Sequence, residues 1–223
     1  MILDWLIQLL PGLLISIQVT LVSLALGMPV GALVGVVVEY GPRWLSWTLT
    51  VLVEVGRGLP ALVVLYLVYF GLPDVGILLD SFWSVVVAFA YTTAAYTSEI
   101  FRGALRGVAR GQFEATAALG LPTWDRYTLV ILPQAARLAG PALLGFAILV
   151  FQGSSVAYAV ALPELLSRAY NIGTITFQYL GVLLLAGAVY AVITIGAGAL
   201  VSRFARRVGM TRGVRIRRLV GNP

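Results

Sequence analysis

The stretch RGQFEATAALGLPTWDRYTLVILP, residues 110–133, is a polar, helix-forming interruption in an otherwise apolar sequence. Its alanines favour a short helix over Gln112 to Leu119, and Gly120 can take the left-handed conformation with which many helices end. The proline that follows cannot continue that helix, whereas Thr123 can cap a second one that carries Asp125 in its first turn. The stretch therefore predicts a helix, a glycine turn and a second helix, a compact knob whose backbone another protein can approach closely.

The composition around this stretch is that of a membrane protein. Hydrophobic residues make up 60% of the 223 residues, charged residues make up 11%, and the mean hydropathy is +0.97. A soluble domain carries about 25% charged residues. The length is enough for one helical bundle and leaves no room for a second domain of ordinary size. We therefore expect an all-α integral membrane protein that forms a single domain over residues 1–223.

Several apolar segments approach the ~20 residues with which a helix crosses the core of a bilayer. They predict five transmembrane helices: Leu13–Val38, Leu45–Phe70, Phe82–Ile100, Leu138–Leu162 and Ile175–Val201. The first contains Gly27, Gly31 and Gly35, a spacing of small residues that predicts close packing against another helix. The segment from Met1 to Leu14 carries Asp4 and no basic residue, so we expect it to be retained rather than removed as a signal peptide.

The 15 basic residues are all arginine, and their placement predicts the side of the membrane on which each loop lies. Arg57 lies within a predicted span. Arg168 falls on one face of the membrane, and every other arginine falls on the opposite face. The positive-inside rule makes that opposite face cytoplasmic. The external face receives four acidic residues: Asp4, Asp74, Asp80 and Glu164. The N-terminus is therefore expected outside and the C-terminus inside, in a multi-pass protein of the cell inner membrane.

The end of the chain, residues 203–223, is rich in arginine. We interpret it as a basic cytoplasmic tail that fixes topology and contacts anionic lipid. Nucleic acid is the weaker interpretation of the +6 net charge, because the arginines cluster beside the apolar spans.

Glu54 and Arg57 are candidates for a substrate path, because they lie three residues apart inside an apolar span. Isolated charges at that depth cost several kcal/mol, so the two side chains should pair or face the interior of the bundle. A structural ion pair and a role in gating both remain open. The nearby Gly56, Gly58 and Pro60 weaken the helix, and a broken helix is tolerated in a membrane where it lines a cavity or packs in protein.

A second polar cluster, Gln152, Ser154 and Ser155, lies midway along the fourth span. These side chains can hydrogen-bond the carboxylate or amine of a substrate. Serine in a membrane helix equally serves helix packing, so both interpretations stay open.

The residue types that are missing exclude several classes of function. The chain has no Cys and no His, and its sequence contains no Lys, so disulfides and the commonest zinc ligands are excluded. An intramembrane enzyme with Ser154 or Ser155 as nucleophile lacks a His or Lys base. The chain also lacks the glycine-rich loop that binds the phosphates of ATP. We therefore expect no enzymatic activity, no metal and no cofactor. A passive channel or an ion-coupled carrier for small polar solutes stays open as an alternative, although neither needs the polar knob.

The knob resembles the EAA loop of the permease subunits of ATP-binding-cassette importers. The resemblance rests on the spacing of Glu114, Ala115, Ala118, Gly120, Leu121, Ile131, Leu132 and Pro133. Other segments are similar to permeases for polar amino acids: Glu54 to Pro60, the Tyr-Phe-Gly-Leu-Pro sequence at 69–73, and AYTSEIFRGAL at 95–105. Two segments differ from that family. Leu59 stands where the family usually has Thr, and Gln152 to Val156 stands where many members have Lys-Asp-Thr-Ser-Leu.

The resemblance implies a type I importer permease with a cytoplasmic helix-turn-helix coupling loop over residues 106–134. It implies coupling to an ATPase through seven residues: Glu114, Ala115, Ala118, Gly120, Leu121, Ile131 and Pro133. The implied partners are cytoplasmic ATPase subunits that use ATP and Mg, a second permease subunit that is the same or a homologous chain, an external solute-binding protein and membrane lipid. The implied function is ATP-driven import of a polar amino acid.

Overall fold

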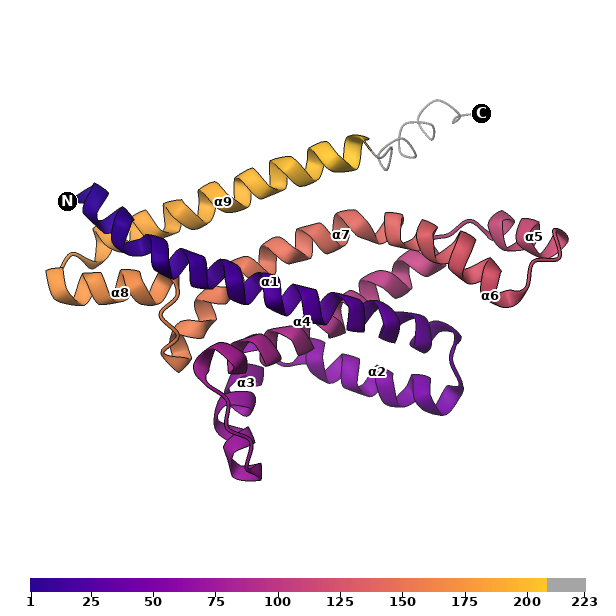
Figure 1. Ribbon diagram of the computed structural model, residues 1–223, viewed down its shortest axis with the longest axis horizontal. Coiled ribbons are helices and arrows are strands. Elements are labelled where there is room, and N and C mark those ends of the chain that lie inside the picture. Colours follow the sequence, from indigo (N-terminus) through magenta and orange to yellow (C-terminus); the bar gives the residue numbers. More distant parts are fainter. Residues whose placement is uncertain (208–223) are drawn as a thin grey trace, which may run out of the picture.

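The computed structural model describes residues 1–207, so most of the predicted basic tail lies outside the described residues. Within that range the regular elements are helices that form an elongated bundle, with α5 and α6 at one end and the N-terminus and α8 at the other (Figure 1). In chain order they are α1 (Ile2–Tyr40), α2 (Arg43–Gly58), α3 (Ala61–Tyr66), the π-helical η1 (Leu67–Gly71), the 3-10 helix η2 (Leu72–Val75), α4 (Ser81–Arg106), α5 (Arg110–Ala118), α6 (Thr123–Asp125), the π-helical η3 (Arg126–Ile131), α7 (Leu132–Gly153), the 3-10 helix η4 (Ser154–Val160), α8 (Leu165–Thr176) and α9 (Tyr179–Arg207).

The seam between α1 and α4 is the most extensive contact in the bundle. Glycines allow the two helices to approach so closely. A Cβ added at Gly31 would lie 2.4 Å from the carbonyl oxygen of Ala94, and one added at Gly27 or Gly35 would meet backbone oxygens of α4 at 2.6 and 2.7 Å. The close packing predicted from the glycine spacing is therefore confirmed.

The number of transmembrane helices is confirmed only in part. Three helices are long and apolar enough to cross a membrane, Ile2–Tyr40, Thr123–Val160 and Tyr179–Arg203, and the bent pair of α2 and α3 raises the number to four. The predicted third span corresponds to α4, which has 26 residues but is rich in hydroxyl side chains. Several of them, including Ser84, Thr93 and Thr97, are buried within the bundle. Because these hydroxyls face protein, α4 does not need the apolar surface that lipid demands.

The second predicted span, Leu45–Phe70, is not one straight helix. α2 ends at Gly58, α3 begins at Ala61, and the two helices are bent by 107° relative to each other. Pro60 explains the break, because it has no backbone N–H and disfavours helical geometry at the preceding residue. Leu59 accordingly has the extended angles φ −87° and ψ 138°. The weakening of the helix predicted from this sequence is confirmed.

The fourth and fifth spans begin elsewhere than predicted. The fourth span continues a helical stretch that begins in the knob at Thr123. Thr123 is the first helical residue of that stretch and not its cap, which is Pro122. Pro133 does not end this stretch. The turn before it, η3, is π-helical, so its hydrogen bonds have a wider spacing than those of an α-helix. This change of spacing accommodates the proline, which has no backbone N–H to donate. The fifth span begins at Tyr179 rather than at Ile175, since Phe177 has a φ of +58° and separates α8 from α9.

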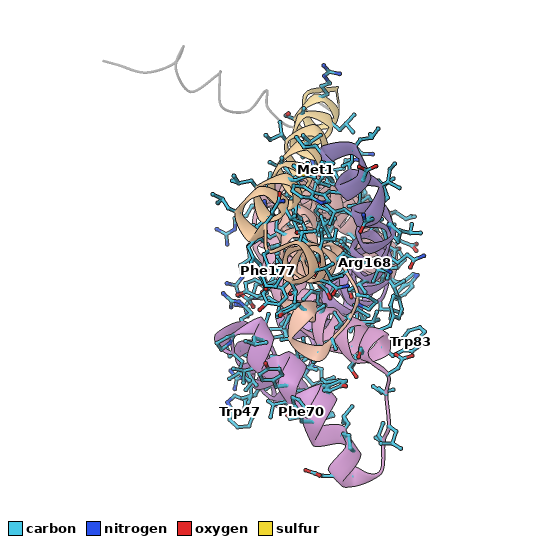
Figure 2. The ribbon with its side chains drawn as sticks, turned by 90° about the vertical axis from the view of Figure 1, so that its left-hand side faces the viewer. Met1, Trp47, Phe70, Trp83, Arg168 and Phe177 are labelled. Carbon is cyan, nitrogen blue, oxygen red and sulfur yellow. The ribbon has the colours of Figure 1, made fainter. Side chains whose placement is uncertain are left out.

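Glu164, which the charge pattern places on the external face, is fully buried. Its carboxylate caps α8 by accepting hydrogen bonds from the N–H groups of Leu166 (2.9 Å) and Ser167 (2.7 Å). It also accepts from the hydroxyls of Tyr190 (2.9 Å) and Ser16 (3.3 Å), and so joins α8 to α9 and α1. Burial nevertheless raises the pKa of Glu164 above its ordinary value. Figure 2 views the molecule from this end, which carries the labelled residues Met1, Arg168 and Phe177.

Candidate functional site

The polar knob lies at the end of the bundle where α1 ends, α2 begins and α4 ends (Figure 1). α5 stops in the left-handed turn that the sequence predicts, with Gly120 at a φ of +67°. The N–H of Gly120 donates to the carbonyl of Ala117 at 3.0 Å, and the N–H of Leu121 donates to the carbonyl of Thr116 at 3.2 Å. These two hydrogen bonds close the end of α5. They require the left-handed conformation at Gly120, which glycine adopts without strain. Nothing lies within 4 Å of a Cβ added at Gly120, so the turn faces open space.

The residues predicted to couple to an ATPase differ in exposure. Leu121 is half-buried, whereas five others are exposed: Glu114, Ala115, Ala118, Gly120 and Pro133. Ile131 is fully buried in a cluster with Leu105 of α4 and Ala135 of α7. Ile131 therefore fixes the knob to the bundle and cannot itself touch another protein.

Three large apolar side chains on the knob, Leu119, Trp124 and Leu129, are exposed and were not among the predicted site residues. Leu119 is 76% exposed and Trp124 is 77% exposed, one on each side of the glycine turn. Large exposed apolar side chains outside the lipid-facing spans are typical of surfaces that contact another protein or a membrane. The position of Leu119 and Trp124 in a polar stretch, next to a predicted turn, is the sequence signal that identifies them.

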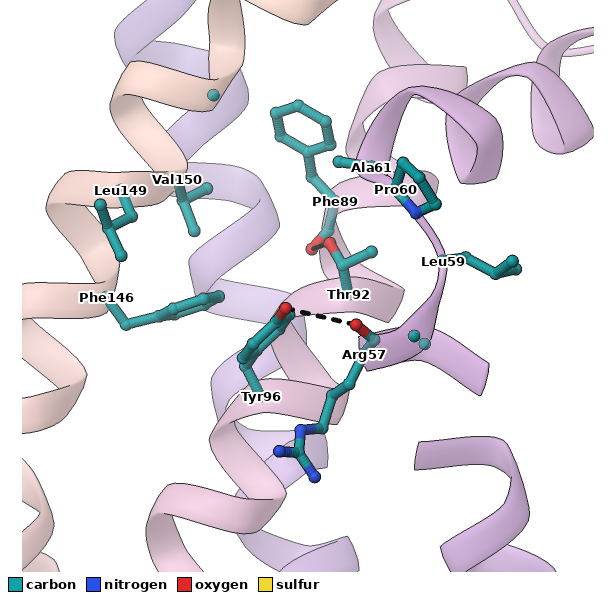
Figure 3. Close-up of a pocket in the computed structure, with 13 residues that line it drawn as sticks. Arg57, Leu59, Pro60, Ala61, Phe89, Thr92, Tyr96, Phe146, Leu149 and Val150 are labelled. Atoms are coloured by element: carbon teal, nitrogen blue, oxygen red, sulfur yellow. Dashed lines mark hydrogen bonds between the residues drawn. The ribbon is translucent and has the colours of Figure 1, made fainter. Parts of the chain in front are cut away.

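An open cavity of about 590 Å³ lies at the break between α2 and α3 and is bordered by α4 and α7 (Figure 3). Phe89, Phe146 and Leu149 provide apolar walls, and Arg57 and Tyr96 provide polar groups. The rings of Tyr96 and Phe146 stack with their centroids 5.1 Å apart. The hydroxyl of Tyr96 donates a hydrogen bond of 3.4 Å to the carbonyl of Arg57, which joins α4 to the end of α2. The cavity thus combines aromatic walls with one cationic side chain.

Arg57 belongs to a chain of ion pairs beside the cavity. One of its terminal nitrogens lies 3.2 Å from a carboxylate oxygen of Glu54 and 3.8 Å from one of Glu99, which pairs with Arg102 at 2.8 Å. The predicted pair of Glu54 and Arg57 is therefore present. The Glu54 side chain is 60% exposed, so this pair adds little stability by itself. The Arg57 guanidinium also lies 6.0 Å from the centre of the Tyr96 ring, within the range of a cation–π contact.

The second polar cluster lies beside this cavity. Gly153 lines it, but Gln152, Ser154 and Ser155 are absent from its lining. The buried Ser154 hydroxyl donates to the carbonyl of Phe151 at 2.7 Å, and the Ser155 hydroxyl donates to the carbonyl of Gln152 at 2.9 Å. Both hydroxyls are thus engaged by the backbone of their own helix, which agrees with the packing interpretation of these serines. The side chain of Gln152 is exposed.

Comparison with known proteins places most of the chain in one family. Residues 27–210 match the family model described as "binding-protein-dependent transport system inner membrane component". The chain is 34% identical over 187 residues to the arginine transport system permease protein ArtQ of Bacillus subtilis, a match that covers 83% of this chain and 85% of that one. It is 33% identical over 212 residues to the glutamate/aspartate import permease protein GltK of Escherichia coli O157:H7, covering 89% and 92%.

A solved structure is similar over almost the whole bundle. The crystal structure of an amino acid ABC transporter with histidines contains a chain that matches with a TM-score of 0.87 and 28% identity. The match covers 92% of this chain and 96% of that chain. The match therefore covers nearly the whole arrangement of helices.

Proposed function

This chain belongs to the family of inner membrane components of binding-protein-dependent transport systems, and from that premise we propose how its elements move a substrate. It is the permease subunit of a polar amino acid ABC importer and a multi-pass inner membrane protein. ATP hydrolysis belongs to a separate subunit. This membership sets aside a passive channel and an ion-coupled carrier.

Five transmembrane helices form the bundle in this proposal: α1, the bent pair α2 and α3, α4, the stretch of α7 and η4, and α9. Glu39 at the end of α1 pairs with Arg106 at the end of α4 at 2.8 Å, which supports placing both ends on one side of the membrane. The arginines at that end make this side cytoplasmic by the positive-inside rule. The N-terminus is then external and the C-terminus cytoplasmic.

The knob, residues 106–134, is the surface on which the ATPase docks. The observation that carries this proposal is the free-standing glycine turn at the arginine-rich end of the bundle, where a Cβ added at Gly120 would meet nothing within 4 Å. Small exposed residues such as Ala115 and Ala118 allow a groove to approach the helix backbone, and Leu119 and Trp124 provide apolar anchors. Ile131 contributes to coupling through its packing, since it holds the knob on the bundle.

Cysteine cross-linking tests this docking, because the chain has no cysteine of its own. Ala118→Cys introduces one exposed thiol on the knob, and a maleimide–benzophenone reagent attached to it should, on illumination, join it to C–H bonds of the ATPase in the purified complex. Ala135→Cys is the matched control, because Ala135 is fully buried beneath the knob and should not react. An Ala118→Cys complex that hydrolyses ATP normally but yields no cross-linked product would contradict the docking site.

The cavity at the break between α2 and α3 is the substrate path. Its volume of about 590 Å³ falls within the range of small-molecule sites. The transported amino acids in the names of two relatives, arginine and glutamate or aspartate, share an α-carboxylate and an α-amino group. Arg57 offers charged donors to the carboxylate, and the hydroxyl oxygen of Tyr96, whose proton is donated to the Arg57 carbonyl, accepts a hydrogen bond from the ammonium group. Recognition of these shared groups leaves the choice of side chain to other parts of the importer.

The remaining predicted path residues have secondary positions in this scheme. Glu54 holds Arg57 from the exposed rim, and the exposed Gln152 extends the path beside Gly153, whereas the Ser155 hydroxyl is engaged by the backbone. Ser154 supports the wall, because its hydroxyl is engaged by the backbone. Arg57→Gln should reduce amino acid uptake by the reconstituted complex while the subunits still copurify, and unchanged uptake would place the path elsewhere.

The complete importer needs more chains than this one. Five helices are few for enclosing a path wide enough for an amino acid, so a second permease subunit, the same or a homologous chain, completes the channel. The ATPase subunits bind ATP and Mg on the cytoplasmic side, and a solute-binding protein delivers the amino acid from outside. Membrane lipid surrounds the bundle, and this scheme assigns no role to nucleic acid.

A further inference from the structure

Three aromatic rings connect the knob to the end of α1. The rings of Tyr40 and Tyr127 lie with their centroids 4.7 Å apart at an angle of 56°. The ring of Tyr127 lies 6.5 Å from that of Phe113 at an angle of 69°. Phe113 belongs to α5, Tyr127 to η3, and Tyr40 is the last residue of α1. The contacts therefore run from the docking helix to the end of a membrane span.

The end of α1 is held as one unit with the beginning of α2. The hydroxyl of Ser46, in the first turn of α2, donates to the carbonyls of Val37 (3.1 Å) and Gly41 (3.4 Å). The N–H of Gly41 donates to the carbonyl of Val37 at 2.8 Å. These bonds make the connection between the two helices a stiff elbow. A displacement of Tyr40 is therefore passed to α2.

α2 carries such a displacement to the cavity. The helix has 16 residues, which corresponds to a rigid rod of about 24 Å. It begins at the elbow and ends at Gly58, and the residues from Gly56 through the break to Ala61 line the cavity. A helix of this length with intact hydrogen bonds moves as one body, so a shift at its first turn changes the cavity wall at its last.

We propose that Tyr40 and Tyr127 are positioning residues that transmit the movement of the docking helix α5, through the elbow and α2, to the wall of the cavity. This inference rests on the proposed docking of the ATPase on the knob. Tyr127 packs against the buried cluster that fixes the knob, whereas Tyr40 is suited to transmission rather than to holding the fold. Tyr40 is 41% exposed, and one turn earlier Val36 already packs against the buried cluster that fixes the knob. Truncation of Tyr40 should therefore leave that attachment in place.

The test uses permease, ATPase and binding protein reconstituted together in lipid vesicles, with a radiolabelled mixture of the protein amino acids as the transported probe. The quantity measured is amino acid taken up per ATP hydrolysed. Tyr40→Ala and Tyr127→Ala should each lower this ratio roughly two- to tenfold, the range that corresponds to the loss of one aromatic pair. ATP hydrolysis should continue, and Tyr40→Phe and Tyr127→Phe, which keep the rings, should restore the ratio.

Two controls make the result specific. Trp47→Ala removes an aromatic ring that is 73% exposed on α2, near the same elbow, and should leave the ratio unchanged. The double variant of Tyr40 and Tyr127 should lose no more than Tyr127→Ala alone, because that substitution already removes the contact with Tyr40. Unchanged ratios in the single alanine variants, additive losses in the double variant, or release of the ATPase from either single variant would each overturn the proposal. Failure of the docking proposal itself is distinguishable, because the Ala118→Cys complex would then hydrolyse ATP without yielding a cross-linked product.

Discussion

The glycine seam between α1 and α4 allows a stability prediction that can be worked out from one distance. A Cβ added at Gly31 would lie 2.4 Å from the carbonyl oxygen of Ala94, whereas ordinary van der Waals contact begins at 3.4 Å. The difference, 3.4 − 2.4 = 1.0 Å, must come from separation of the helices, because the neighbouring atom belongs to the backbone and has no rotamer to change. A gap of 0.5–1 Å already loses roughly a quarter to a half of the dispersion attraction across a contact.

The expected cost of Gly31→Ala is that of overpacking, about 1–3 kcal/mol of unfolding free energy. Alanine also favours a helix over glycine by about 1 kcal/mol, which partly hides the cost. Gly145→Ala in α7 is the matched control, because nothing lies within 4 Å of a Cβ added there. It receives the gain in helix propensity without the clash. The difference in stability between the two variants should therefore be about 1–3 kcal/mol.

Titration of the detergent-solubilised protein with a denaturing detergent, followed by tryptophan fluorescence, measures this difference. The five Trp residues of the chain provide the signal. A Gly31→Ala variant as stable as Gly145→Ala, within about 0.5 kcal/mol, would refute the reasoning. That result would mean that α1 and α4 do not pack through this seam.

Three further predictions concern topology, coupling and the buried carboxylate. Reporter fusions after Asp80 should be external and those after Arg110 cytoplasmic, and a cytoplasmic Asp80 fusion would contradict the five-helix arrangement. Gly120→Asp should uncouple ATP hydrolysis from uptake or release the ATPase, since a side chain at a φ of +67° costs about 1 kcal/mol and adds bulk at the docking surface; normal uptake would exclude that role. Glu164→Gln should lower stability by about 1–3 kcal/mol, because an amide cannot accept all four hydrogen bonds. Burial raises the pKa of Glu164 in the folded protein, so the folded state holds the proton more tightly than the unfolded chain. The stability of the wild type relative to Glu164→Gln should therefore fall as the pH rises above 4.5, the ordinary value, and a relative stability that rises with pH would contradict this assignment.

The helix-turn-helix of the knob was predictable because it depends on neighbours in the sequence. Gly120 ends α5 in the left-handed turn expected of it, and Asp125 lies in the first turn of the next helix. The continuation of that second helix through Pro133 into α7 was not predicted, because it depends on a π-helical turn that accommodates the proline. Such a turn depends on how the knob continues into the bundle, and the proline alone gives no sign of it.

The sequence by itself determined that this is a membrane protein. It also determined the glycine turn and the break at Pro60, and it showed the resemblance to importer permeases. These features depend on composition or on residues a few positions apart, which sequence displays directly. Only the tertiary structure decided that Arg57 reaches Glu99, that Glu164 is buried between three helices, and that Tyr40 touches Tyr127. The physical reason is that each of these contacts joins segments far apart in the chain. Their formation depends on the angle and rotation with which whole helices pack, and no local pattern records those quantities.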